Sequence, residues 1–191
     1  MALPVTAMNT VRKNLFNVQP AAPAVQPPPV FVAPAVLQEN PGHVKQQLRA
    51  ELNGVFGALD TIRLHIRTNL TENTAVATLH QLRQSTNALN DIKSRIFTGD
   101  MQLKNLAAHV TRAQDEATQF YAQQLRNLVL HFAHEVARED GTMTQEQVQA
   151  RFNIYAEAFA LLNEFLQRDP QYQPTLQGME AQLLYVKETL E

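Results

Sequence analysis

Apolar side chains recur at alternating steps of four and three residues in three separate segments of this chain. That spacing keeps one stripe of a helix turned toward a neighbouring helix, as in a coiled coil or helical bundle. No segment alternates apolar and polar residues as a half-buried strand does. The pattern therefore predicts an all-α protein whose long helices carry heptad-like seams. The predicted self-association seam consists of Leu48, Leu52, Val55, Leu59, Ile62, Ile66, Val148, Phe152, Tyr155, Phe159, Leu162, Leu166, Leu176, Met179, Leu183, Val186 and Leu190.

Capping and turn residues divide the chain after residue 41 into separate helices. Thr71, Asp100 and Thr144 are suited to cap helix N-termini, and Gly99 and the Asp169–Pro170 pair are suited to end helices. We expect one helical domain over residues 42–191, and the first two of its helices form either a hairpin or one rod. The expected helices span about residues 42–70, 72–97, 101–138, 144–168 and 175–190.

Proline content separates the N-terminal segment from the rest of the chain. Eight of the ten prolines lie in residues 1–41, and proline lacks the backbone donor that a helix interior needs. We expect a disordered Pro-rich arm over residues 1–41, with a short amphipathic helix at 5–18 and an extended stretch at 19–34. The arm is either a solvated spacer or a docking ligand with Phe31 and Val32 as anchors.

Charge is distributed unevenly along the chain. Residues 45–112 carry nine Lys and Arg against five Asp and Glu, whereas residues 113–191 carry five against twelve. Opposite charge favours folding of one half on the other, or head-to-tail pairing of chains. We therefore expect Arg63, Arg67 and Arg83 to pair with the acidic half, and we expect no nucleic-acid partner, which usually needs a more basic domain. No apolar run approaches the ~18 residues that span a bilayer.

Residues suited to catalysis or metal binding are sparse. The absence of cysteine excludes disulfides, thiolate zinc sites and cysteine nucleophiles. His134 and Glu135 begin the metalloprotease pattern H-E-x-x-H, but Arg138 stands where the second histidine is needed. His131 and His134 could share a metal, although histidines in such apolar surroundings are more often edge-of-core residues. We predict no catalytic, cofactor or metal site and no enzymatic activity.

Two stretches resemble a known family of viral proteins. They are QPAAPAVQPPPVFVAP at residues 19–34 and the helical stretch Leu52–Ile96, which is rich in Asn, Gln and Thr. Together they resemble the Pro-rich joint and the C-terminal part of baculovirus polyhedron envelope (calyx) proteins. The resemblance implies a structural protein on the surface of occlusion bodies, in the nucleus or cytoplasm of infected host cells, that assembles through coiled coils. Residues 100–191 have no counterpart in this resemblance.

These observations predict a non-enzymatic structural or assembly protein. We expect a homo-oligomer that also binds other coiled-coil proteins, and we expect Asp at position Leu59 or Phe159 to abolish the association because a charge would enter the seam. The alternative is a secreted helical effector or adaptor that binds a host or partner protein through its helical faces and its N-terminal arm. The spacing fixes neither the number of copies nor the relative orientation of their helices.

Overall fold

Five helices make up the computed structural model, which describes residues 41–138, 143–166 and 169–191. Within these ranges the protein is all-α, as predicted, and each helix begins and ends within two residues of its expected range. The predicted arm and its helix at 5–18 lie outside the described residues. The helices are α1 (Pro41–Asn69), α2 (Glu72–Arg95), α3 (Met101–Ala137), α4 (Gln145–Leu166) and α5 (Gln173–Leu190), with a 3-10 turn, η1 (Pro170–Tyr172), before α5.

Local hydrogen bonds explain where the helices begin. The Asp100 carboxylate caps α3 by accepting from the backbone N–H of Leu103 at 3.0 Å. At the start of α4, the Thr144 N–H donates to Gln147 Oε1 at 2.9 Å, and the Gln147 N–H donates to Thr144 Oγ1 at 3.2 Å. At the start of α2, the Thr71 N–H donates to Thr74 Oγ1 at 2.9 Å. These caps satisfy backbone donors that a helix leaves without partners, and they confirm the three N-caps expected from sequence.

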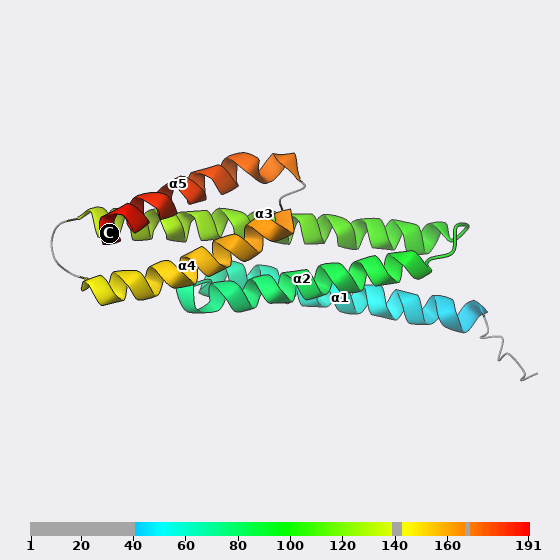
Figure 1. Cartoon of the computed structure of the whole chain (residues 1–191). Helices are drawn as coiled ribbons and strands as arrows, with labels where there is room; N and C mark the ends of the chain where they lie inside the picture. Colours follow the sequence, from blue (N-terminus) through cyan, green and yellow to red (C-terminus); the bar gives the residue numbers. More distant parts are fainter. Residues whose placement is uncertain (1–40, 139–142, 167–168) are drawn as a thin grey trace, which may run out of the picture. The chain divides into compact units, whose positions relative to one another are not determined.

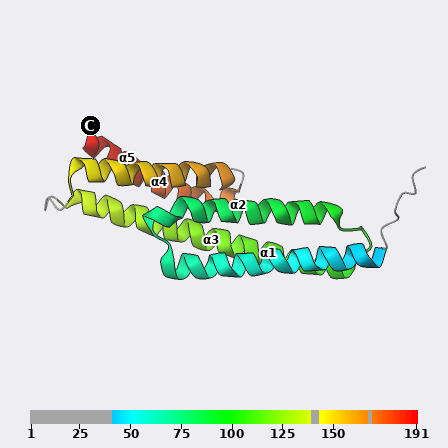
Figure 2. The ribbon, with the colours of Figure 1, turned by 90° about the horizontal axis from the view of Figure 1, so that it is seen from below.

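The central pair of the bundle in residues 39–191 is α2 and α3 (Figure 1). Helix α1 packs on one side of this pair, and the hairpin of α4 and α5 packs on the other. Figure 2 shows α2 lying between α1 and α4. Because α2 folds back along α1, the first two helices form a hairpin and not one rod.

Helices α1 and α3 run in the same direction, since the chain reverses twice between them. Phe56 stacks on His109 with ring centroids 5.1 Å apart, and further along both helices the Arg67 guanidinium lies 4.8 Å from the ring centroid of Phe120. This parallel alignment places the N-termini of α1 and α3 together at the α2–α3 turn (Figure 1).

One apolar core runs through all five helices. Leu52, Leu79, Val110 and Leu162, from four different helices, have no exposed surface. Each buried side chain of this kind stabilises the folded state by about 1.5–3 kcal/mol. The heptad-like stripes of the sequence are thus satisfied inside a single chain.

A few polar side chains interrupt the core between α2 and α3. The Tyr121 hydroxyl donates to the Ala75 carbonyl at 2.8 Å, and burial raises the pKa of this phenol. Gln114 donates from Nε2 to Thr118 Oγ1 at 3.3 Å, while its Oε1 has no hydrogen-bond partner. An unpaired buried polar atom costs stability, so this position is packed less favourably than the apolar layers around it.

Candidate functional site

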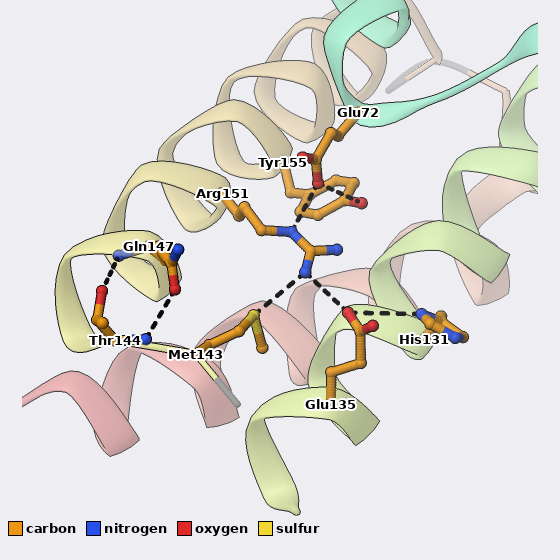
Figure 3. A network of polar contacts seen from close by, with 8 residues as sticks. All are labelled: Glu72, His131, Glu135, Met143, Thr144, Gln147, Arg151 and Tyr155. Atoms are coloured by element: carbon orange, nitrogen blue, oxygen red, sulfur yellow. Dashed lines mark hydrogen bonds and ion pairs between the residues drawn. The ribbon is translucent and has the colours of Figure 1, made fainter. Parts of the chain in front are cut away.

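The most connected polar cluster of the described residues surrounds Arg151 on α4 (Figure 3). Its Nε donates to Glu72 Oε2, at the start of α2, at 2.6 Å, and its Nη1 donates to Glu135 Oε2, near the end of α3, at 2.8 Å. The Tyr155 hydroxyl, one turn further along α4, donates to the same Glu72 oxygen at 3.3 Å. Three helices therefore meet at one guanidinium, which we call the Arg151 network.

Aromatic rings and burial shape the electrostatics of this network. The guanidinium lies 4.9 Å from the ring centroid of Phe132, and the ring centroids of Phe132 and Tyr155 are 5.1 Å apart. Burial disfavours the charge of Arg151, but the Tyr155 hydroxyl and the carboxylates of Glu72 and Glu135 outweigh it and raise the pKa of the guanidinium. Burial is also the main cause that raises the pKa of the Tyr155 hydroxyl.

This arrangement joins three helices through one guanidinium. The two carboxylates bind the same permanent cation, so each already has its charge compensated. Met143 Sδ, just before α4, accepts a further hydrogen bond from Arg151 Nη1 at 3.2 Å. The chemistry available here is that of a structural ion-pair network that joins α2, α3 and α4.

Of the two histidines considered as metal ligands, His131 lies beside this network (Figure 3). The His131 side chain is 72% exposed, and its Nδ1 is 3.6 Å from Glu135 Oε2. His134 is exposed as well. Across residues 41–138, 143–166 and 169–191, no three His, Asp or Glu side chains come close enough to hold a metal ion.

All side chains of the predicted self-association seam lie in or against the core of this one chain. Most are buried, and Val55, Phe152, Phe159 and Leu190 are partly buried against them. A contact between copies through these residues would require the copies to exchange helices. Association through the seam stays a prediction, whereas exposed side chains can contact a second copy without any such exchange.

Two of the three arginines expected to pair with the acidic half do so. Arg63 contacts Glu116 at 3.1 Å, and Arg83 contacts Glu164 at 3.1 Å. Arg67 lies instead over the ring of Phe120. The charge asymmetry of the sequence is therefore used in part to fold the basic segment against the acidic one.

Exposed apolar and basic side chains gather where α1 and α3 begin. Phe97 and Met101, on either side of the α2–α3 turn, are 60% and 64% exposed. A hollow of about 380 Å³ at this turn adjoins another of about 370 Å³ between α1 and α3, and the two share Lys45 and Gln102. We call this surface the basic tip, and define it as Lys45, Arg49, Phe97, Met101 and Lys104.

The outer surface of α5 carries the second cluster of exposed apolar side chains. Leu184 and Tyr185 are 54% and 44% exposed. Glutamates precede and follow them on the same helix. We call this surface the acidic α5 face, and define it as Glu180, Leu184, Tyr185, Glu188 and Glu191.

A groove of about 500 Å³ between α1 and α2 is lined by small side chains together with charged ones such as Glu51, Asp91 and Arg95. Its lining includes Gly54, Ala58 and Ala88. A Cβ atom at Gly54 or Gly57 would meet no described atom within 4 Å. Glycine inside a helix costs about 1 kcal/mol relative to alanine, and no contact among the described residues requires glycine at either position.

Neither the Arg151 network nor the basic tip was predicted from sequence. Glu72 and Arg151 are separated by 79 residues, and no local pattern connects two such positions. The basic tip has a weak local indication, because Phe97 and Met101 flank the turn residues at 98–100. Apolar residues next to a turn at the end of a bundle have fewer helices available to cover them.

Comparison with known proteins identified no relative. No protein-family model, no curated protein and no solved structure matches the chain. Among the described helices, none is long and apolar enough to cross a membrane.

Proposed function

We propose that this chain is a non-enzymatic structural protein that assembles with copies of itself and with other helical proteins. The observation that carries the proposal is the set of large apolar side chains that the bundle leaves exposed. Single exposed apolar residues are ordinary, whereas grouped ones mark interaction surfaces. Four of them form the two groups already described, at the basic tip and on the acidic α5 face.

Two further observations support assembly. Charged residues make up only 18% of the chain, below the roughly 25% of average proteins, so less ionic solvation is lost when two such surfaces meet. The resemblance of residues 19–97 to polyhedron envelope proteins is in keeping with the same role, and would place the assembly on the surface of a viral occlusion body. The adaptor alternative uses the same exposed surfaces for an unrelated partner.

The test is the mass of the full chain in solution. Light scattering coupled to size exclusion, and sedimentation equilibrium, should give a mass above the 21.5 kDa of one chain that increases with concentration. A mass of one chain at every concentration up to about 100 µM, where contacts weaker than about 5 kcal/mol escape detection, would overturn self-assembly. That result would favour the adaptor function.

A further inference from the structure

We propose that copies of this protein bind head to tail, with the basic tip of one copy on the acidic α5 face of the next. This inference rests on the proposed self-assembly and specifies its contact surfaces. Each surface combines two exposed apolar side chains with a net charge of one sign, although Asp100 at the tip and Lys187 on α5 carry the opposite charge. The positive charge of the basic tip is therefore matched by the negative charge of the acidic α5 face, and each surface offers apolar side chains to the other.

The basic tip carries more positive charge than its own acidic residues neutralise. The Asp100 carboxylate forms an ion pair with Lys45 Nζ at 3.0 Å and accepts a hydrogen bond from the Leu103 N–H at the start of α3. Lys104 contacts the Thr98 carbonyl, and among the described residues neither Lys104 nor Arg49 forms an ion pair with a carboxylate. The N-termini of α1 and α3 add the positive ends of two helix dipoles, against one negative end at the C-terminus of α2. An acidic surface is the natural partner for this tip.

The acidic α5 face presents the opposite pattern. Glu180, Leu184 and Glu188 follow one another at steps of four, so they share one side of the helix. Glu191 at the end of the helix pairs with Lys187 at 3.5 Å, while Glu180 and Glu188 form no ion pair with any described residue. Two unpaired carboxylates thus flank an exposed leucine.

The two surfaces of one copy are too far apart to cover each other. Helix α5 packs along the second half of α3, where a Cβ atom on Gly178 would lie 3.8 Å from Arg126 Nε. From Arg126 back to Met101, α3 rises by about 37 Å at 1.5 Å per residue. In Figure 1 the α2–α3 turn and the C-terminus lie at opposite ends of the helices. The pairing must therefore join different copies.

A contact between two different surfaces has a structural consequence. Each copy keeps one free tip and one free α5 face after binding, so the contact continues from copy to copy and builds an open chain or a ring. A contact between two identical surfaces would stop at a dimer. Charge complementarity should make assembly weaken with added salt.

The test uses two full-length variants that each block one surface. Met101→Glu places a negative charge in the basic tip at the first position of α3, where acidic residues suit the helix. Leu184→Lys places a positive charge on the acidic α5 face at an exposed helical position. Leu64→Lys is the matched control, because Leu64 is 63% exposed and lies on α1 outside both surfaces.

Each blocking variant alone should bind itself at least about tenfold more weakly than the unmodified chain, as expected when like charges oppose across an interface. The control should assemble like the unmodified chain. Mixed together, the two blocking variants should form a dimer of one copy of each, because the intact tip of L184K meets the intact face of M101E. Unchanged circular dichroism and melting temperature would show that each variant is folded.

The outcomes separate this inference from the proposed function. If the unmodified chain assembles and both variants assemble equally well, the head-to-tail contact is wrong and self-assembly stands. If the mixture stays monomeric while each variant is folded, the two surfaces do not pair. If M101E keeps its self-assembly but loses binding to vesicles containing phosphatidylserine, the tip binds an anionic lipid surface and the inference is overturned. A monomeric unmodified chain would overturn both proposals.

Discussion

Replacing Arg151 with methionine should destabilise the bundle without changing its helix arrangement. The methionine keeps an aliphatic stem against Phe132 but removes the guanidinium that lies between Glu72 and Glu135. The two carboxylates would then face each other's charge without a cation. The start of α2 and the end of α3 would lose their shared partner on α4.

The exposure of the three side chains sets the size of this effect. The side chains of Arg151, Glu72 and Glu135 are 25%, 27% and 34% exposed, so the network lies between a surface ion pair and a buried one. Surface pairs contribute about 0–1 kcal/mol, and breaking a fully buried pair costs about 3–5 kcal/mol. We expect Arg151→Met to lower the free energy of unfolding by about 2 kcal/mol, which lowers the melting temperature by about 4–8 °C.

Urea unfolding followed by circular dichroism measures this loss. Arg83→Met is the matched control, because Arg83 pairs with a single carboxylate, Glu164, that is 59% exposed. This variant should lower the free energy of unfolding by less than about 1 kcal/mol. Combining Arg151→Met with Glu72→Gln should give a coupling energy of about 1 kcal/mol or more. A loss no larger than that of the control, or additive effects of the two changes, would refute a stabilising role for the network.

Three further changes test the packing. Leu59→Asp puts an unpaired charge at a position with no exposed surface and should remove at least about 3–5 kcal/mol of stability, so a helical spectrum with unchanged melting temperature would contradict the fold. Gly57→Ala should stabilise α1 by up to about 1 kcal/mol in urea unfolding, since its Cβ meets open space; a loss would reveal a contact there. The Asp115 side chain is exposed, but partial desolvation, counteracted by Lys93 and reinforced by Asp169, raises the pKa of its carboxyl group above 3.8. The ionised form therefore weakly destabilises the fold above that raised pKa. Asp115→Asn should therefore increase the free energy of unfolding near pH 7 by less than about 1 kcal/mol, seen as a slightly higher melting temperature. This gain should vanish as the pH falls below 3.8.

The predicted self-association seam shows which features of the packing sequence periodicity can predict. Steps of four and three identify the residues that turn toward a neighbouring helix, and Leu52, Leu162 and Met179 are indeed buried. Periodicity does not identify the neighbour. The same stripe can be covered by a second copy or by another helix of the same chain, and in this structure helices of the same chain cover it.

Helix α3 shows a second gap between pattern and packing. The apolar spacing of residues 101–138 predicts an inward stripe through Leu106, Val110, Ala113, Ala117 and Phe120 that then shifts register onto Tyr121, Leu125, Leu128 and Phe132. Six of these side chains are buried, whereas Leu106, Phe120 and Leu128 are only partly buried. Leu103, Ala107 and Val129, which lie outside the predicted stripe, are buried as well. The difference arises because the first part of α3 packs against α1, whereas its second part also packs against α5, so no single stripe describes both.

Sequence by itself determined the helical class, the bounds of the helices to within two residues and the caps at Thr71, Asp100 and Thr144. These features depend on interactions between residues a few positions apart, which a local pattern records. Only the tertiary structure decided that α1 and α2 form a hairpin, that Arg151 joins Glu72 to Glu135, and which apolar side chains remain exposed at the ends of the bundle. Each of these depends on which distant helices pack together, and that choice is set by the fit of whole helix faces.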